Sequence, residues 1–372
     1  MAYVGLSGTE RSTRRLVDPA FWRGRRVLLT GHTGFKGAWL SLWLQQLGAE
    51  VAGLSNCVPT TPSLYELARV GAAMSDELVT DVRDYDAVRA ALARARPEIV
   101  IHMAAQSLVR RSYADPRETF ETNVMGTVNL LEAIRTTGHA RVVVNVTSDK
   151  CYENDGRDRG YREDDAMGGV DPYSSSKGCA ELVTASFRRA FFAAGPDGPQ
   201  LASTRAGNVI GGGDWSEDRL VPDLMRAALQ GEPLRVRSPE AVRPWQHVLN
   251  PLCGYLVLAQ ALWESDDYAT AWNFGPADGE ARPVAELVER LRVLWPGGLD
   301  WDRDEDEQPH EAHALRLDSS RARTRLGWRP VWGLDEALER IVTWYQAFAA
   351  GADMRATTHE QVEAFAQAQA DA

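Results

Sequence analysis

The feature of this chain that most constrains its fold is a glycine-rich turn between an apolar run and a helical pattern. The apolar run covers residues 26–30, glycines follow at 31, 34 and 37, and the helical pattern extends over about 36–47. Glycine allows a tight turn and a close approach of the backbone to a ligand, while the helix start offers unpaired N–H groups and the positive end of its dipole. The pattern predicts a dinucleotide-pyrophosphate site, although an ordinary strand-to-helix turn has similar glycines. The predicted contacts are Gly31, Thr33, Gly34, Phe35, Lys36 and Gly37.

A tyrosine and a lysine one helical turn apart form the second informative motif. Tyr173 and Lys177 open a helical stretch over 173–192, with Asp171 as a suitable N-cap and Pro172 as a suitable first helical residue. Residues four apart lie on one face of a helix. A phenol with an ordinary pKa of about 10 is a poor base near neutrality, and a nearby ammonium group favours its phenolate form. We predict a reactive pair here; the alternative is an exposed Tyr and Lys on a helix surface.

A cluster of polar residues follows the strand-like run at 141–147. Ser148, Asp149 and Lys150 come directly after this run. In a doubly wound sheet the carboxyl ends of the strands face the ligand crevice, so the cluster belongs there. Alcohol oxidation needs no adjacent acid and base, so Asp149 and Lys150 suggest a second proton-transfer step. The alternative is an ordinary strand-ending turn in which the aspartate caps and the lysine is solvated.

Strand-like and helical patterns alternate through the first half of the chain. Strand-like runs occur at 26–30, 51–54, 98–102, 141–147 and 201–205, and helical patterns at about 36–47, 84–95 and 118–137. This alternation predicts an α/β fold with a doubly wound, parallel Rossmann-type sheet and a smaller, discontinuous substrate-binding portion. The predicted parts are a disordered N-terminal extension at 1–22, a dinucleotide-binding domain at 23–207 and 246–275, a substrate-binding domain at 208–245 and 276–350, and a C-terminal tail at 351–372 that forms a frayed helix.

Five segments together carry a resemblance to a known family. They read Thr-Gly-His-Thr-Gly-Phe-Lys-Gly at 30–37, Val-Thr-Ser-Asp-Lys-Cys-Tyr at 146–152, Asp-Pro-Tyr-Ser-Ser-Ser-Lys-Gly-Cys-Ala-Glu at 171–181, Arg-Ala-Gly-Asn-Val-Ile-Gly-Gly-Gly-Asp-Trp at 205–215 and Arg-Pro-Trp-Gln-His-Val at 243–248. On these segments the chain resembles the extended short-chain dehydrogenases, from Phe21 to about Trp344. Among them it is most similar to nucleotide-sugar 4,6-dehydratases of the CDP-sugar branch, which have a lysine at the position of Lys150 where the dTDP-sugar branch has a glutamate.

The resemblance implies a hydro-lyase that uses NAD and converts CDP-D-glucose to CDP-4-keto-6-deoxy-D-glucose for deoxysugar biosynthesis. In the implied mechanism, the Tyr173 phenolate removes the C4 hydroxyl proton as hydride passes from C4 to NAD. Ser148 is the implied hydroxyl partner of the tyrosine, with Thr147 as the weaker candidate. Lys150 as base and Asp149 as acid then eliminate water across C5 and C6, and the hydride returns to C6. The division of roles within that pair stays open, because a neighbouring carboxylate opposes the neutral lysine that a base requires.

The resemblance also implies further contacts with the cofactor. These residues are Asp81, Val82, Ala104, Ala105, Gln106, Tyr173 and Lys177. Asn123 resembles the superfamily's structural asparagine. One position departs from the pattern, because Gly-Leu-Ser-Asn at 53–56 lacks the acidic residue that binds the ribose 2′-hydroxyl of NAD. No arginine replaces that acid, so NAD rather than NADP is expected on the resemblance.

Candidate substrate ligands come from the irregular part of the chain. They are Asn208, Arg219, Arg237 and Arg243, since arginine forks suit diphosphate oxygens. Arg243, beside Pro-Trp-Gln-His, is the strongest candidate, and a solvated surface arginine is the alternative for each. The acidic stretch at 302–307 with His310 and His313 falls short of a zinc pattern, so we predict no metal.

Composition limits the partners and the compartment. A formal net charge of −11 argues against nucleic acid, no run resembles a membrane span, and the first twenty residues lack the apolar core of a signal peptide. The cysteines at 57, 151, 179 and 253 show no C-x-x-C pattern, so free thiols and a cytoplasmic location are expected. The resemblance implies a homodimer or homotetramer that pairs through helices at 118–137 and 173–192.

Other functions compete with this interpretation. A nucleotide-sugar 4-epimerase of the same superfamily would use Tyr173 and Lys177 but would not need Asp149 and Lys150. A dehydratase for another nucleotide-hexose is a further alternative, because residue chemistry does not identify the nucleobase. A non-catalytic NAD-sensing protein is more distant, since the set formed by Ser148 and the Tyr-Lys pair is intact.

Overall fold

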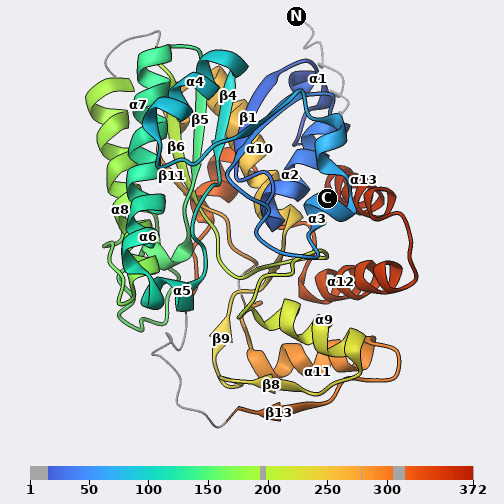
Figure 1. Ribbon diagram of the computed structural model, residues 1–372. Helices are drawn as coiled ribbons and strands as arrows, with labels where there is room; N and C mark the ends of the chain where they lie inside the picture. The colour runs from blue at the N-terminus through green and yellow to red at the C-terminus, as the bar shows by residue number, and fades with distance from the viewer. Residues whose placement is uncertain (1–15, 193–197, 278, 305–314, 372) are drawn as a thin grey trace, which may run out of the picture.

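A parallel sheet forms the centre of the protein (Figure 1). The computed structural model describes residues 16–192, 198–277, 279–304 and 315–371. Within them, seven strands pair in the order β11-β6-β5-β4-β1-β2-β3. The strands are β1 (Arg26–Thr30), β2 (Glu50–Ser55), β3 (Asp76–Val79), β4 (Ile99–His102), β5 (Val142–Val146), β6 (Gln200–Arg205) and β11 (Ala271–Asn273). The strand order runs outward in both directions from β1, so the predicted doubly wound α/β fold is confirmed.

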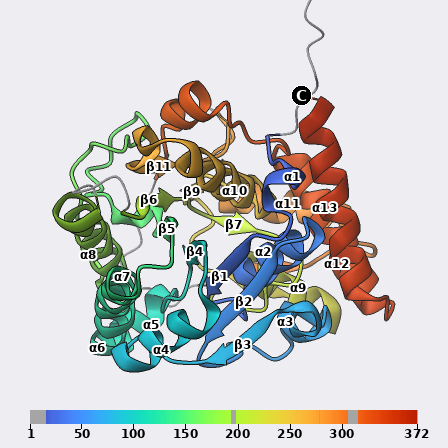
Figure 2. The ribbon, with the colours of Figure 1, turned by 90° about the horizontal axis from the view of Figure 1, so that it is seen from above.

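Helices cover both faces of this sheet (Figure 2). Successive strand residues point to opposite faces, so Val27 and Leu29 belong to one apolar core and Leu28 to the other. The first core also contains α2 (Phe35–Gln46) and α10 (Leu249–Glu264). The second contains α4 (Tyr85–Ala95) and α7 (Gly126–Thr137), with part of α8 (Pro172–Phe187) packed against it. Burial on both faces explains why these strands read as continuous apolar runs.

Short strand pairs and further helices complete the architecture. The pairs are β7 (Val209–Ile210) with β10 (Gln246–His247), β8 (Leu234–Val236) with β13 (Trp301–Arg303), and β9 (Val242–Arg243) with β12 (Arg282–Pro283). The remaining helices are α1 (Pro19–Trp22), α3 (Leu64–Leu67), α5 (Val109–Ala114), α6 (Pro116–Phe120), α9 (Leu220–Gln230), α11 (Val284–Leu294), α12 (Leu334–Ala349) and α13 (Met354–Asp371). Figure 1 shows α9, α11, β8 and β13 together below the sheet, beyond the end from which α5 emerges.

Two long predicted helices contain π-type turns. Glu121–Met125 separates α6 from α7 within the helix predicted at 118–137, and Arg188–Phe192 ends the helix predicted at 173–192. The remainder of both helices lies where the apolar spacing predicts it. The predicted domain boundaries remain a prediction. Helix α10 and strand β11 lie within the segment 246–275, and they pack on the same sheet as β1–β6, as expected of one domain.

The predicted N-terminal extension is too long. Residues 1–15 lie outside the described residues, but the rest of the segment 1–22 is packed. Val17 and Trp22 are buried, and the indole Nε1 of Trp22 donates to Gln260 Oε1 over 2.8 Å. A buried indole requires such an acceptor, and α10 provides it. Order therefore begins at least as early as Leu16.

The prediction of a frayed C-terminal helix is wrong. The tail predicted at 351–372 contains α13, whose residue Phe365 is completely buried. Its ring makes edge contacts with Trp43 and Trp332, at centroid distances of 5.6 and 5.1 Å. Trp344 Nε1 also donates to Thr358 Oγ1 over 3.0 Å. The apolar face of α13 is sparse, but its partners come from distant parts of the chain and hold it in place.

None of the described helices has both the length and the apolar character needed to cross a bilayer. All four cysteines are free thiols, as predicted. The cytoplasmic location remains a prediction.

Phe365→Ala tests whether α13 is an integral part of the core. Removing a fully buried aromatic side chain leaves a cavity, so we expect the free energy of unfolding to fall by about 3–5 kcal/mol in urea denaturation. Gln367→Ala, at an exposed position on the same helix, should change it by less than about 0.5 kcal/mol. Equal effects from the two substitutions would mean that α13 is not packed in solution.

Candidate functional site

The glycine turn after β1 forms a backbone cradle. Gly31 has a φ of +74°, and a Cβ built on it would lie 2.8 Å from Ala104 N. A Cβ on Gly37 would lie 2.0 Å from Gly31 O. Gly34 occupies the N-cap of α2 without a side-chain cap, so the first amides of this helix remain available to an anion. Glycine at positions 31 and 37 is therefore a steric requirement.

All the predicted site residues line a single cleft of about 1660 Å³. Its walls include the glycine turn, the segments after β3, β4 and β5, the start of α8 and the loop at 206–223. The predicted cofactor, catalytic and substrate residues meet here although they are up to about 210 positions apart in sequence, from Gly31 to Arg243. The geometry brings them together; it does not by itself assign their roles.

The tyrosine and lysine lie on the first turns of α8. Asp171 caps this helix by accepting from Ser174 N at 2.9 Å, and Pro172 is the first helical residue, as the sequence predicts. The side chains of Tyr173 and Lys177 are both buried. Burial raises the pKa of Tyr173 to about 12, while a hydrogen bond with Ser148 and the positive charge of Arg219 act in the opposite direction. The contribution of Arg219 could not be recognised from the Tyr-x-x-x-Lys spacing.

The cluster after β5 forms a short 3-10 turn, Asp149–Cys151, directly beside α8. Ser148 Oγ donates to Asp149 Oδ1 at 3.0 Å and accepts from Lys150 N at 3.2 Å. Burial raises the pKa of Asp149, opposed chiefly by the charge of Lys150. The Thr147 hydroxyl instead donates to Glu181 Oε1 at 2.5 Å. Ser148 is therefore the hydroxyl available to the tyrosine.

Lys36 from the glycine turn also reaches this cluster. Its Nζ donates to Tyr255 OH on α10 over 2.9 Å. Loss of hydration lowers the pKa of Lys36 to about 7, with a further decrease from the charge of Lys177. The chain contains only three lysines, Lys36, Lys150 and Lys177, and all of them line the cleft. Lysine, unlike arginine, can be deprotonated at accessible pH, which distinguishes these positions from the rest of the chain.

The segment after β4 is tied to α8 by an asparagine. Asn123 accepts from Gln106 N at 2.9 Å and donates through Nδ2 to Ser176 Oγ at 2.9 Å. This places Ala104, Ala105 and Gln106 along the cleft. The structural role expected of Asn123 is consistent with these contacts.

Asp81, the predicted adenine contact, lines the cleft and is held by two neighbouring side chains. Asp81 binds Arg83 at 2.7 Å and accepts from Asn56 Nδ2 at 3.1 Å. The hydrogen bonds from Arg83 lower the pKa of Asp81 to about 2. Asn56 stands where the missing strand-end acid is expected, and its amide links β2 to the predicted adenine contact.

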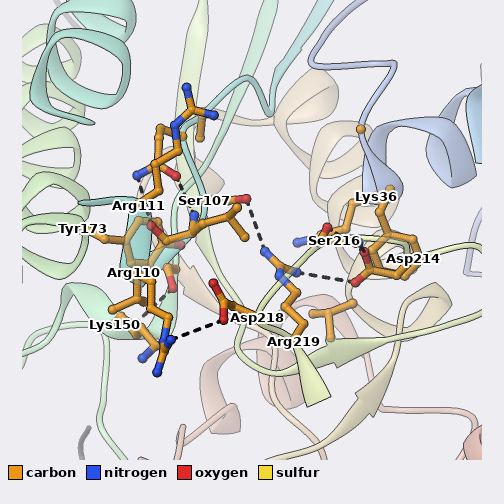
Figure 3. Close-up of a pocket in the computed structure, with 18 of the residues that line it drawn as sticks. Lys36, Ser107, Arg110, Arg111, Lys150, Tyr173, Asp214, Ser216, Asp218 and Arg219 are labelled. Atoms are coloured by element: carbon orange, nitrogen blue, oxygen red, sulfur yellow. Dashed lines mark hydrogen bonds and ion pairs between the residues drawn. The ribbon is translucent and has the colours of Figure 1, made fainter. Parts of the chain in front are cut away.

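All four substrate candidates are part of the wall of the cleft, and Figure 3 shows Arg219 between Ser107 and Asp214. Arg219 is 3.7 Å from Asp214 and donates to Ser107 Oγ at 3.2 Å. Arg237 donates to Asp218 Oδ1 at 2.9 Å. The wall also contains Arg243, which is buried, and Asn208, which has a φ of +45° and a buried Nδ2 without a protein hydrogen-bond partner.

Sequence reasoning missed several residues of this wall. Arg110 and Arg111 line the cleft, and Arg110 lies 3.7 Å from Asp218 across it (Figure 3). Both arginines lie in α5, the first helix after β4. Segments that follow parallel strands face the crevice, so their place in the sequence is the signal that could have identified them. Within the described residues no group of three metal-ligating side chains occurs. The stretch with His310 and His313 lies outside the described residues.

Comparison with known proteins identifies the family. A sequence model of the NAD dependent epimerase/dehydratase family matches residues 27–271. The chain belongs to this family. The chain is 50% identical over 357 residues to the CDP-glucose 4,6-dehydratase of Salmonella typhimurium (strain LT2), which covers 95% of this chain and 99% of that protein.

Solved structures of the epimerase/dehydratase family share the fold. A dTDP-glucose 4,6-dehydratase double mutant from Streptomyces venezuelae, with NAD bound, superposes with a TM-score of 0.75 at 24% identity, covering 89% of this chain and 99% of that chain. The UDP-glucose 4-epimerase of Thermus thermophilus in complex with NAD gives a TM-score of 0.72 at 25% identity, covering 86% and 99%.

The cradle fits the cofactor of the family. NAD carries a diphosphate, and α2 begins at this turn with Gly34 as an N-cap that makes no side-chain hydrogen bond, so its first amides can bind such a group. NAD is therefore the cofactor of this protein, as predicted. The residues that would hold it are those of the glycine turn, Asp81 and Val82, and Ala104–Gln106.

Gly37→Ala tests the cradle. The new Cβ would collide with Gly31 O, so the turn must shift, and we expect NAD affinity measured by calorimetry to fall about tenfold or more, which is about 1.4 kcal/mol. Gly178→Ala is the matched control, because the nearest atom to its Cβ would be Cys151 O at 3.4 Å. A Gly37→Ala protein that binds NAD as tightly as the control would contradict this assignment.

Proposed function

We propose that the protein is a hydro-lyase that dehydrates CDP-D-glucose to CDP-4-keto-6-deoxy-D-glucose, for deoxysugar biosynthesis. The observation that carries the proposal is the position of Asp149 and Lys150 beside Ser148 and Tyr173 in one cleft with the NAD cradle. The 50% identity to the Salmonella CDP-glucose dehydratase supports both the reaction and the nucleobase. NAD, when bound, accepts a hydride from C4 of the sugar and returns it to C6.

Tyr173 is the proposed base for the C4 hydroxyl. Its phenolate form must be reached from a raised pKa, so each neighbour that favours the anion matters. Ser148 supplies a hydroxyl that can donate to the phenolate, and Arg219 and Lys177 supply positive charge. Because the product keeps its C4 ketone, the phenol must pass this proton on, and it replaces the proton that Asp149 gives to the departing water; Lys150 returns its proton to C5 as the hydride reaches C6. Burial of Ser148, Tyr173 and Lys177 limits the access of water to the oxidised sugar.

Asp149 and Lys150 are the proposed pair for the elimination. Once C4 is a ketone, the C5 proton becomes acidic. The raised pKa of Asp149 favours its protonated form, which is suited to donate to the departing C6 hydroxyl. A protonated Asp149 also removes a negative charge beside Lys150. Lys150 is then suited to remove the C5 proton.

The diphosphate of the substrate is the proposed partner of the arginine-rich wall. Arg219, Arg237 and Arg243 can each present two N–H groups to phosphate oxygens. The unpartnered Nδ2 of Asn208 offers another donor from a strained backbone position. A 4-epimerase would use the same wall and the same Tyr-Lys pair, but it gives no function to an acid and base at 149 and 150.

Incubation with CDP-, dTDP-, UDP- and GDP-glucose tests the function. We expect NAD-dependent formation of a 4-keto-6-deoxy product, lighter by one water, from the CDP sugar. A product of unchanged mass would indicate epimerisation, and exclusive turnover of another nucleotide sugar would indicate a different nucleobase. Either result would contradict the proposal.

Lys150→Met tests the elimination step. Methionine keeps the length of the side chain but cannot accept a proton, so solvent deuterium should no longer enter C5. NAD affinity should remain within about twofold of wild type, because Lys150 is not part of the cradle. Mass spectrometry and NMR of the sugar measure the exchange. Continued exchange at C5 in this variant would exclude Lys150 as the base.

We also propose that the protein pairs with a second copy through α6–α8, as a homodimer or homotetramer. Exposed apolar side chains gather on these helices and the turns that join them: Phe120, Met125, Leu182 and Phe191 are between 36% and 62% exposed. Apolar side chains clustered at a surface are typical of an interface. Helices α7 and α8 lie side by side at one edge of the molecule (Figures 1 and 2).

Leu182→Glu tests this interface. A carboxylate at the centre of an apolar contact remains unpaired, so we expect the oligomer to dissociate at least about tenfold more readily in light-scattering measurements. Val293→Glu, at a still more exposed position on α11, should leave the oligomer unchanged. A wild-type protein that is monomeric at micromolar concentration would refute the pairing.

A further inference from the structure

A buried carboxylate lies one helical turn beyond the reactive lysine. Glu181 on α8 is only 2% exposed and accepts three hydrogen bonds. They come from Thr147 Oγ1 at 2.5 Å, Ser203 Oγ at 2.6 Å and Arg205 Nη2 at 2.8 Å. Burial raises the pKa of Glu181, but Arg205 and the hydrogen bonds more than reverse this effect and leave the pKa below its ordinary value. Glu181 is therefore an anion in the interior.

Arg205 extends this contact to a third and a fourth segment. Its Nη1 donates to Tyr152 OH at 2.6 Å and to Glu163 O at 3.1 Å. The phenol of Tyr152 in turn donates to Asn273 Oδ1 at 2.7 Å. The ion pair thus connects α8, β6, β11 and the chain on both sides of the 3-10 turn that contains Asp149 and Lys150.

The attachment points enclose the reactive turn. Thr147 directly precedes Ser148, and Tyr152 directly follows the turn Asp149–Cys151. One buried pair therefore fixes both ends of a segment of four residues. Tyr173 and Lys177 belong to the same helix as the carboxylate, so the pair sets the position of one reactive group relative to the other.

Glu181 also acts on the charge of Lys177. Residues four apart on a helix are neighbours, and burial lowers the pKa of Lys177 to about 8 while Glu181 is the largest opposing influence. The other titratable groups that face Lys177 are His102 on β4, Lys36 on α2, Cys151 on the 3-10 turn and Tyr173 on α8 itself. Glu181 is the carboxylate that acts on Lys177, and its lowered pKa keeps it ionised near neutral pH.

We infer that Glu181 is a positioning residue, which keeps Lys177 cationic within the cleft and holds the Ser148–Cys151 turn against the Tyr173 helix through its pair with Arg205. This inference rests on the proposed function for its catalytic meaning. The ammonium group is required beside the phenolate, and burial lowers its pKa. Glu181 opposes this effect, although it does not itself line the cleft.

The small number of lysines makes the inference directly testable. Protein labelled with [ε-¹³C]lysine has three side-chain signals, which the substitutions Lys36→Met, Lys150→Met and Lys177→Met assign. In Glu181→Gln the titration midpoint of Lys177 should fall by about one pH unit or more, while that of Lys150 changes less. The measurement needs neither substrate nor turnover, so it stands even if the proposed reaction is wrong.

Glu163→Gln is the matched control. Glu163 is also a buried carboxylate of this region, and it accepts from Asn273 N at 3.0 Å, but it is not among the groups that act on Lys177. Its substitution should lower the melting temperature and leave the Lys177 midpoint in place. A general loosening of the core would instead move both variants equally, and that result would contradict the inference.

A double variant covers the case in which Glu181→Gln does not fold because Arg205 is left unpaired. Glu181→Gln with Arg205→Met removes both charges, a change that buried pairs often tolerate. The Lys177 midpoint should again fall. If it matches wild type in the folded variant, Glu181 has only a structural role and the inference is overturned.

Activity provides a separate readout. If the protein dehydrates CDP-D-glucose, the alkaline limb of its kcat/KM profile should move to lower pH in the Glu181 variants, with a loss of about fivefold at pH 8 and less than about twofold at pH 6. An inactive wild type would contradict the proposed function alone, whereas an unshifted limb in an active variant would contradict this inference alone.

Discussion

The close contact between the end of β5 and the start of α8 is the constraint on which the site depends. A phenol, an amine and an acid–base pair can act on neighbouring sugar carbons only if these two segments are held together. A glycine after β6 permits a third segment to approach it: a Cβ on Gly207 would lie 1.7 Å from Asp149 Oδ2, so a side chain there would displace that carboxylate. The parallel sheet brings the strand end to the cleft, and this glycine allows the segment after β6 to lie against it.

Loss of hydration determines the chemistry of the groups inside this contact. It acts toward the neutral form of each group, raising the pKa values of Tyr173 and Asp149 and lowering those of Lys36 and Lys177. A protonated aspartate benefits directly from this effect. The tyrosine and lysine require charged forms and depend on compensation from Ser148, Arg219 and Glu181. The burial that makes one group a suitable acid thus makes support necessary for the others.

Local sequence patterns predicted those parts of the fold that are determined locally. The glycine turn, the cap and first turns of α8 and the apolar strands follow from nearest neighbours and from the spacing of apolar residues. The packing of α13 does not, because its alanines and glutamines give a weak amphipathic pattern and its aromatic partners Trp43 and Trp332 are distant in sequence. The burial of Trp22 was not predicted for the same reason, because its hydrogen-bond acceptor Gln260 belongs to α10, which is distant in sequence.

The cleft was predicted more completely than its electrostatics. Every proposed site residue lines it, yet no sequence pattern indicates that Arg219 acts on Tyr173, that Arg110 approaches Asp218 or that Lys36 reaches Tyr255. Each of these relations joins segments whose distance depends on how the irregular part folds over the sheet. Their residue types alone, an arginine or a lysine in a loop, are compatible with plain solvation.

The confinement of lysine to the cleft has a practical consequence. Because the exterior of the described protein carries its positive charge as guanidinium, amine-directed acylating reagents find side-chain targets only where the sugar and coenzyme would sit. Covalent immobilisation or dye coupling through lysine would therefore block the reactive centre. Coupling through the exposed thiol of Cys57 would modify the same cleft, because Cys57 lines it, whereas chemistry directed at exposed carboxylates such as Glu363 on α13 would reach other parts of the molecule.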